Sequence, residues 1–252
     1  MVAFAEESTV LDRVLTQQDS SKKSTIIFLH GLGDDGHGTG YALGQQFQMY
    51  NKLLNTKWVL PTAAIDKEVG ERCWYRPHDL PSPLKPRVPG QDDDAEVDEE
   101  EDEAGILRTV DFIDGLVEKE VADGVDVGKI VVGGFSQGCA VSMVWGLKGK
   151  YRDQVAGVYG LSGYFPKIKA VTKDALTGEE AKKTTKQWFC AHGMADRAVA
   201  INLFADGQKR LQDFVDKETV EGHVYQDLAH TVAGPEIRDI WLWFKQVLGE
   251  EE

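Results

Sequence analysis

The sequence predicts an α/β fold in which a mostly parallel sheet is covered by helices on both faces. Short β-rich runs alternate with longer amphipathic segments, and this alternation is typical of helices packed on a parallel sheet. Several of the short runs are almost continuously apolar, as expected for parallel strands buried on both faces. The chain shows no internal repeat and no linker between two cores. We therefore expect a single domain over residues 1–252.

Each expected element follows from its local pattern. The strands are short runs rich in β-branched and aromatic residues. The helices are segments whose apolar residues recur at helical spacing, as Val141, Val144 and Trp145 do. In chain order we expect strand 25–29, helix 41–54, strand 58–60, helix 106–121, strand 130–133, helix 137–147, strand 155–159, strand 187–190, helix 201–215, strand 223–225 and helix 235–248.

One segment, at about 80–103, breaks this pattern. Four prolines lie between Pro81 and Pro89, and ten of the twelve residues from Asp92 to Glu103 are acidic. Without these ten acids, 32 acidic residues remain against 28 basic ones, so the formal charge falls from −14 to −4. The remaining surface is only mildly acidic, which argues against general nucleic-acid binding. The segment itself is either a solvated insertion or an attractor for basic protein substrates.

The cysteines and the chain ends indicate a cellular compartment. Cys73, Cys139 and Cys190 have no metal-type spacing, which favours reduced, buried thiols. The N-terminal residues lack the basic start and apolar run of a secretory signal, and the chain has no run of roughly eighteen apolar residues. No lipidation motif is present at either end. We expect a soluble protein of the cytoplasm, with the nucleus as a further compartment and only transient contact with membrane surfaces.

The stretch Gly134-Phe135-Ser136-Gln137-Gly138 joins strand 130–133 to helix 137–147. A G-x-S-x-G sequence between a strand and a helix is typical of a nucleophile elbow, in which a sharp turn presents the serine hydroxyl. Glycine two places before and two places after the serine leaves room for the chain to pass. The alternative is a glycine-rich turn with an incidental serine. In its strand-to-helix context, the stretch indicates that Ser136 is a catalytic nucleophile.

A serine nucleophile needs an oriented base, and in this type of fold the acid and the histidine follow the serine along the chain. His230 comes just after the apolar run 223–228 and shortly before the Gly234-Pro235 start of the last helix, and Asp196 follows strand 187–190. We therefore expect His230 to be the base and Asp196 to orient it, although Asp196 could instead cap the helix that follows. His192 and His223 are weaker candidates, and His192 is better explained as a residue that steadies its loop.

The glycine-rich loop at 28–38 follows the first strong strand. Acyl transfer requires at least two N–H groups that face the developing oxyanion, and we expect the amides of Leu32 and Gln137 to supply them. A phosphate-binding loop is the competing interpretation, but neither a P-loop nor a dinucleotide fingerprint is present. His30, His37 and Asp34 match no metal-ligand pattern, which favours a role in bracing the loop.

Together these motifs resemble the acyl-protein thioesterase (lysophospholipase-like carboxylesterase) family of α/β-hydrolases, from about residue 26 to residue 244. The matching stretches are His30-Gly31-Leu32-Gly33-Asp34, Gly36-His37-Gly38, Cys73-Trp74-Tyr75, Glu101-Asp102-Glu103-Ala104-Gly105-Ile106, Gly133-Gly134-Phe135-Ser136-Gln137-Gly138, His192-Gly193 four residues before Asp196, and His230. The chain departs from the family pattern at Arg197-Ala198-Val199-Ala200, at Cys139 and in the longer acidic segment. None of these departures removes a catalytic group.

The resemblance implies an α/β-hydrolase fold and an enzyme that cleaves fatty acyl thioesters on protein cysteines. It places the nucleophile at Ser136, the acid at Asp196, the base at His230 and the oxyanion amides at Leu32 and Gln137, with no metal or organic cofactor. Its implied partners are S-acylated proteins or acyl esters.

Trp74 and Leu32 are further candidates for the acyl groove, with core packing as the alternative for Trp74. Two other functions stay open. One is a general carboxylesterase or lysophospholipase, and the other is a non-catalytic acyl-binding protein.

Overall fold

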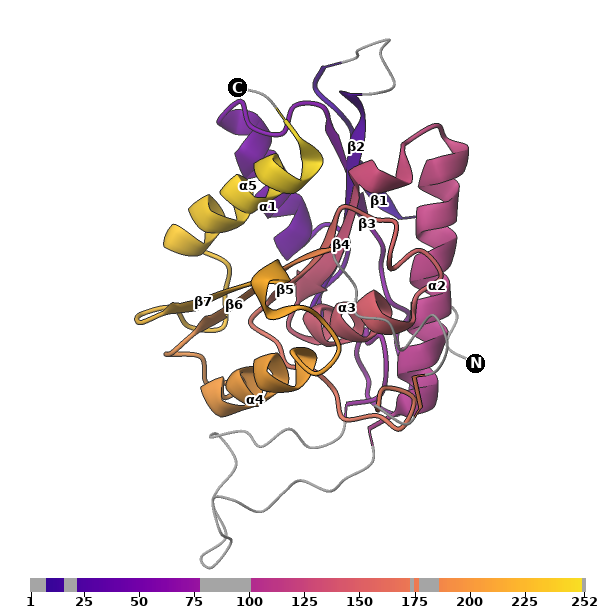
Figure 1. Ribbon diagram of the computed structural model, residues 1–252, viewed down its shortest axis with the longest axis vertical. Helices are drawn as coiled ribbons and strands as arrows, with labels where there is room; N and C mark the ends of the chain where they lie inside the picture. Colours follow the sequence, from indigo (N-terminus) through magenta and orange to yellow (C-terminus); the bar gives the residue numbers. More distant parts are fainter. Residues whose placement is uncertain (1–7, 16–21, 78–100, 173–174, 177–185, 251–252) are drawn as a thin grey trace, which may run out of the picture.

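The computed structural model (Figure 1) describes residues 8–15, 22–77, 101–172, 175–176 and 186–250. Within them, one seven-stranded sheet has the order β1-β3-β2-β4-β5-β6-β7. The strands are β1 (Thr9–Leu11), β2 (Ser24–Leu29), β3 (Thr56–Leu60), β4 (Ile130–Phe135), β5 (Gly157–Leu161), β6 (Gln187–Gly193) and β7 (Val220–Tyr225). Only β1 pairs antiparallel, with β3. The expected mostly parallel sheet is confirmed.

Helices cover both faces of this sheet (Figure 1). The helices are α1 (Thr39–Met49), α2 (Glu103–Ala122), α3 (Gln137–Lys148), α4 (Ile201–Leu211) and α5 (Pro235–Leu248), with short 3₁₀ turns η2 (Val127–Lys129) and η4 (Lys217–Thr219). Apolar residues of α1 and α5 form one core layer with the sheet, and those of α2, α3 and α4 form the other. None of the helices in the described ranges is long and apolar enough to cross a membrane.

The side chains of strand β2 contribute to both core layers. Ile26 and Phe28 belong to the layer under α1 and α5, whereas Ile27 and Leu29 belong to the layer under α2 and α3. Successive side chains in a strand point to opposite faces, so a strand covered on both sides must be apolar at every position. This requirement explains the continuous apolar runs in the sequence.

Several expected boundaries were wrong. The helix expected at 41–54 ends at Met49, because Asn51 and Leu53 adopt positive φ angles of 54° and 52° that end a right-handed helix. The helix expected at 201–215 ends at Leu211. The strand expected at 155–159 is shifted by two residues, to Gly157–Leu161. The edge strand β1 was not expected.

The acidic segment expected at about 80–103 lies mostly outside the described residues, which resume at residue 101. Its last acids begin α2 three residues earlier than predicted. Asp102 caps the helix by accepting a hydrogen bond of 2.9 Å from the amide of Gly105. The carboxylate of Glu103 accepts hydrogen bonds from the amides of Lys169 and Ala170, at 3.0 and 2.9 Å. These acids therefore join the start of α2 to the loop that follows β5.

Candidate active site

Ser136 forms the turn between β4 and α3. Its backbone has φ 56° and ψ −116°, an angle pair that costs a non-glycine residue about 1–3 kcal/mol and is concentrated at functional sites. Gly134 and Gly138 pack directly against β2, because a Cβ atom on either residue would overlap the carbonyl oxygen of Leu29. The tight passage of the chain thus requires glycine on both sides of the serine, as the sequence predicted.

Ser136, His230 and Asp196 form one hydrogen-bonded series. Nε2 of His230 lies 3.0 Å from Oγ of Ser136, and Nδ1 lies 2.7 Å from Oδ2 of Asp196. The three residues follow β4, β7 and β6, and the carboxyl ends of these parallel strands meet at one edge of the sheet. The phenyl ring of Phe135 packs against the imidazole, with ring centroids 4.7 Å apart. The structure therefore brings together the three predicted residues.

The electrostatics of Asp196 suit a residue that orients an imidazole. Burial raises the pKa of this carboxyl, but hydrogen bonds from His230 and from the amides of Val199 and Ala198 outweigh burial and lower it. The two amides donate to Oδ1 at 2.9 and 2.8 Å, which leaves Oδ2 for His230. An ionised Asp196 accepts a hydrogen bond from the N–H group at Nδ1, so the lone pair of Nε2 faces the serine hydroxyl.

The loop after β2 lies against the elbow. A Cβ atom on Gly31 would lie 3.3 Å from Cβ of Ser136. The amides of Gly33 and Asp34 donate to the carbonyls of Arg72 and Gly31, whereas the amide of Leu32 has no acceptor among the described residues. Gln137 is the first residue of α3, where an amide N–H has no acceptor within the helix. The backbone amides of Leu32 and Gln137, the two predicted oxyanion donors, are thus both available to donate to a bound substrate.

His30 and Asp34 brace the loop after β2. The imidazole of His30 is buried, contacts the carbonyl of Gly31 through Nδ1 at 2.6 Å and accepts the amide of Ala63 through Nε2 at 3.0 Å. Burial lowers the pKa of His30, which favours the neutral ring. The carboxylate of Asp34 accepts bonds from the amide and the hydroxyl of Thr39, both at 3.0 Å. In the described part of the chain, no group of His, Cys, Asp and Glu could hold a metal ion.

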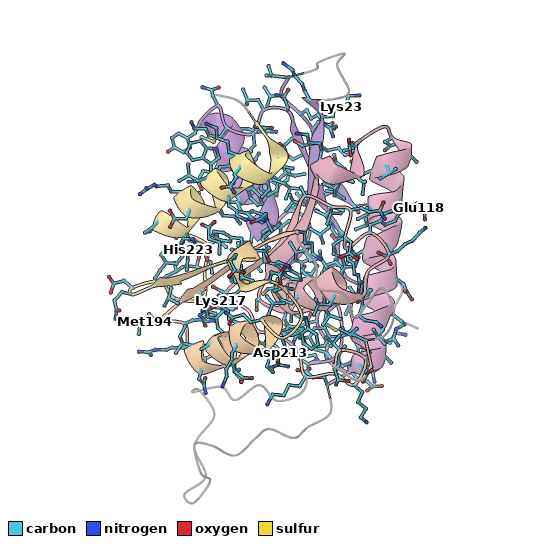
Figure 2. All side chains as sticks on the ribbon, viewed as in Figure 1. Lys23, Glu118, Met194, Asp213, Lys217 and His223 are labelled. Atoms are coloured by element: carbon cyan, nitrogen blue, oxygen red, sulfur yellow. The ribbon has the colours of Figure 1, made fainter. Side chains whose placement is uncertain are left out.

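His192 lies behind the acid rather than beside the nucleophile. Its ring is fully buried, donates from Nδ1 to the carbonyl of Gly193 at 2.9 Å, and places Nε2 3.8 Å from Oδ2 of Asp196. Burial lowers the pKa of His192, so it is a neutral packing residue. His223 contacts Glu221 at 2.7 Å on the edge strand β7 (Figure 2).

Trp74 does not line a groove. Its side chain is 1 % exposed, and its indole N–H donates to the carbonyl of His30 at 2.8 Å. The ring stacks on Phe112 of α2. The expectation that Trp74 contacts the acyl chain is therefore corrected in favour of core packing, because a buried indole has no face left for a ligand. Leu32, in contrast, is 42 % exposed and stays a candidate.

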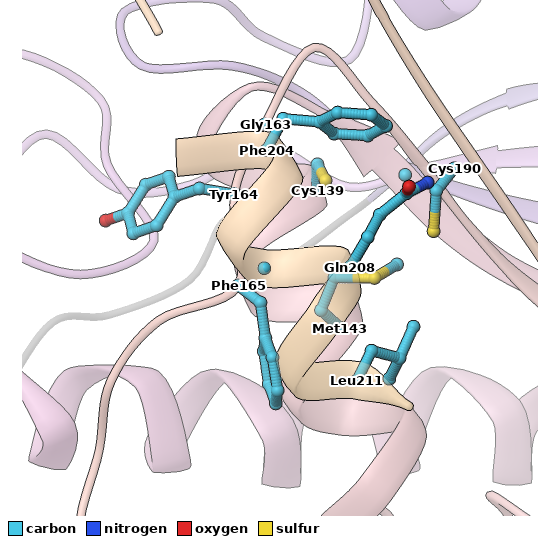
Figure 3. Close-up of a pocket in the computed structure, with 11 residues that line it drawn as sticks. Cys139, Met143, Gly163, Tyr164, Phe165, Cys190, Phe204, Gln208 and Leu211 are labelled. Carbon is cyan, nitrogen blue, oxygen red and sulfur yellow. The ribbon is translucent and has the colours of Figure 1, made fainter. Parts of the chain in front are cut away.

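An apolar pocket lies beside the first turn of α3 (Figure 3). Gly163 connects it to the elbow, since a Cβ atom there would lie 2.7 Å from the carbonyl oxygen of Ser136. The cavity volume is about 20 Å³, enough for about one water molecule. The side chains around it are mostly apolar and come from α3, the loop after β5, β6 and α4: Cys139, Met143, Tyr164, Phe165, Cys190, Phe204, Gln208 and Leu211.

The cysteines are reduced, as predicted. Cys73, Cys139 and Cys190 are all buried and free. Burial raises the pKa of Cys190 to about 12 and that of Cys139 well above its ordinary value, so both remain protonated thiols at neutral pH. They act as small packing residues beside the pocket.

The chain matches the sequence profile described as Phospholipase/Carboxylesterase over residues 12–247. It belongs to this family. The acyl-protein thioesterase 1 of Yarrowia lipolytica is 33% identical over 90% of the chain and 93% of that protein. A probable carboxylesterase SOBER1-like protein of Arabidopsis thaliana is 29% identical over 92% of the chain and 82% of that protein.

Solved structures of relatives share the fold. The Zea mays acyl-protein thioesterase 2 superposes with a TM-score of 0.75 at 23% identity, covering 96% of this chain and 99% of that one. SOBER1 of Arabidopsis thaliana gives a TM-score of 0.69 at 26% identity, covering 90% of this chain and 99% of that one. The α/β-hydrolase fold and the family that the sequence motifs predicted are therefore confirmed.

Two features of the site were missed by sequence reasoning. The side chain of Gln137 bonds to the backbone of Trp74 and Tyr75, although only its amide had been considered. The carboxyl of Glu236 is fully buried near Asp196. A glutamate in the first turn of a helix is common on exposed surfaces, so no local signal distinguished this one.

Proposed function

We propose that the chain is a serine hydrolase that removes fatty acyl groups from protein cysteine thioesters through an acyl-enzyme. The observation that carries this proposal is the 3.0 Å contact between Nε2 of His230 and Oγ of Ser136. The relatives named acyl-protein thioesterase support the thioester as substrate. Membership of the family makes the chain a carboxylic ester hydrolase.

In the first half-reaction, His230 takes the proton of Ser136 as Oγ attacks the carbonyl carbon. The amides of Leu32 and Gln137 stabilise the negative charge that develops on the carbonyl oxygen. Asp196 stabilises the imidazolium. When the carbon–sulfur bond breaks, His230 returns the proton to the leaving thiolate, and the acyl group stays on Ser136.

In the second half-reaction, His230 removes a proton from water as the water oxygen attacks the acyl carbon. His230 then returns this proton to Oγ of Ser136 as the ester bond breaks, which releases the fatty acid and restores the serine. Every proton transfer therefore passes through one imidazole. A thiolate leaves readily, so positioning of the acyl carbonyl against the two amides matters more than strong acid catalysis. No metal or organic cofactor takes part in these steps.

The first test is labelling with a fluorophosphonate probe, which modifies an activated serine. Wild-type protein should be labelled, and Ser136→Ala should not. Absence of labelling in wild-type protein would favour a non-catalytic acyl-binding protein. Labelling that survives in Ser136→Ala would place the nucleophile elsewhere.

A second candidate function is hydrolysis of short carboxylic esters. The relative of Arabidopsis thaliana named as a probable carboxylesterase supports it. Competition between a palmitoylated peptide and a short-chain aryl ester separates the two functions. A strong preference for the aryl ester would contradict the thioesterase proposal.

The acidic segment bears on the choice of protein substrate. Residues 78–100 lie outside the described part of the chain, and their role as an attractor for basic substrates stays a prediction from charge. Deletion of residues 91–100 should weaken the salt dependence of turnover for a basic acylated peptide. An unchanged salt dependence would leave only the interpretation as a solvated insertion.

A further inference from the structure

The side chain of Gln137 binds the segment that contains Trp74. Its Oε1 accepts the amide of Trp74 at 2.8 Å, and its Nε2 donates to the carbonyl of Tyr75 at 2.9 Å. All three residues are buried. The primary amide thus pairs with two backbone groups of one short segment, and this pairing fixes the start of α3 relative to that segment.

The same segment reaches the loop after β2. The indole N–H of Trp74 donates to the carbonyl of His30 at 2.8 Å, and the two rings are in tilted contact with centroids 4.7 Å apart. His30 lies two residues before Leu32. The hydroxyl of Thr109 in α2 holds the carbonyl of Trp74 at 2.7 Å, so the segment is anchored to a third element.

From these contacts we infer that Trp74 is a positioning residue that holds the two oxyanion amides, those of Leu32 and Gln137, at a fixed spacing. The inference rests on the proposed function, because it assumes that these amides bind an oxyanion. The indole links to the loop that carries Leu32, and the backbone of Trp74 links to Gln137. One residue therefore couples two donors that come from different elements of the fold.

The geometry of an oxyanion site explains why such a coupling matters. The donors must lie about 2.7–3.1 Å from the oxyanion in the transition state, and a misplacement of about 1 Å can lower a rate about 100-fold. The loop after β2 and the start of α3 are joined to different strands, so their relative position depends on the contacts between them. The buried bonds of Trp74 provide such contacts.

Trp74→Phe tests the inference, because phenylalanine keeps an aromatic ring against His30 and Phe112 but removes the indole N–H. We expect kcat to fall about 10- to 100-fold with KM within about twofold of wild type. The affinity for a trifluoromethyl ketone, which forms a tetrahedral oxyanion with the serine, should fall in parallel. The pH dependence of kcat/KM should not change, since His230 is untouched.

Trp145→Phe is the matched control. Trp145 is also fully buried, and its indole donates to Oδ1 of Asp114 at 2.8 Å, toward the far end of α3. This variant should lose similar thermal stability yet keep kcat and ketone affinity within about twofold of wild type. The inference is overturned if Trp74→Phe has the kcat and ketone affinity of the Trp145→Phe control.

Gln137→Met provides a second variant if Trp74→Phe does not fold. It removes both side-chain bonds, keeps the backbone amide and should also lower kcat at constant KM. Where both variants fold, their effects on kcat should be less than additive, because they interrupt the same series of contacts. Fully additive effects would overturn the coupling. The proposed function is tested separately, by whether Ser136→Ala abolishes the hydrolytic activity of the wild-type protein. Failure of the proposed function is therefore distinguishable from failure of this inference.

Discussion

The carboxyl group of Glu236 is buried within electrostatic range of Asp196, the acid that holds His230. Burial and, to a smaller extent, the charge of Asp196 raise the pKa of Glu236 to about 8. The nearby amide of Ala233 opposes this rise without forming a hydrogen bond of normal geometry. Glu236 is therefore a neutral acid at pH 7, and Asp196 is an ionised one.

This difference predicts how stability depends on pH. The ordinary pKa of glutamate is 4.5, and that of Glu236 in the folded chain is about 8. Between these two pH values, Glu236 holds its proton in the folded chain and loses it on unfolding. The folded state binds more protons, so the contribution of Glu236 to the unfolding free energy falls as pH rises through this window. The slope approaches about 1.4 kcal/mol per pH unit.

Glu236→Gln should remove this slope, because glutamine resembles the neutral acid. Chemical denaturation at pH 5 should give similar unfolding free energies for wild type and variant. At pH 8 the variant should be more stable by several kcal/mol. The exposed Glu218→Gln is the control and should follow the wild-type curve. Parallel curves for wild type and Glu236→Gln would contradict the assignment.

Asp196→Asn tests the orientation of the base. The asparagine side chain can donate to Nδ1 of His230, which favours the tautomer that carries its proton on Nε2 and cannot accept from Ser136. We expect kcat to fall about 10⁴-fold, with thermal stability close to that of wild type. Steady-state kinetics and a melting curve on the same preparation measure both. A loss of less than tenfold would exclude Asp196 from this role.

Gly138→Ala tests the packing of the elbow. The added methyl group would overlap the carbonyl of Leu29, and overpacking of this kind costs about 1–3 kcal/mol or more. Urea denaturation should show this loss, together with reduced fluorophosphonate labelling. Gly115→Ala in α2 meets no atom within 4 Å and should stabilise the chain by about 0.5–1 kcal/mol. Equal effects of the two substitutions would refute the steric argument.

Phe204→Ala tests whether the pocket beside Ser136 selects the acyl chain. Phe204 is 6 % exposed and lines the pocket from α4, so its truncation enlarges the cavity at a stability cost of about 3–5 kcal/mol. The ratio of kcat/KM for a C16 thioester to that for a C4 thioester should rise. Phe47→Ala, a truncation of a buried phenylalanine in the core layer on the opposite face of the sheet, should leave the ratio unchanged. An unaltered ratio in Phe204→Ala would show that acyl chains bind elsewhere.

The fold and the serine site were predictable where local chemistry is decisive. Glycine at 134 and 138 identified the elbow, because a strand-to-helix turn this tight excludes side chains. The helix at 235–248 was predicted to the residue, since Gly234 precedes it and Gly249, with φ of 62°, ends it. The chain order of Ser136, Asp196 and His230 indicated their convergence before their distances were known.

Other features depended on partners distant in the sequence. The three residues of β1 are a strand because they pair with residues of β3 that lie 47 to 51 positions further along the chain, and no local pattern marks them. The burial of Trp74 follows from contacts with His30 and Thr109, so its aromatic ring could not reveal whether it faced a ligand or the core.

The sequence by itself determined the alternation of buried strands and helices and the type of each catalytic group, because backbone sterics and periodicity act over a few residues. Only the tertiary structure decided the protonation state of Glu236, the hydrogen-bond partners of the Gln137 side chain and the width of the pocket. These properties depend on burial and on distances between elements, and the order of residues along a chain does not specify them locally.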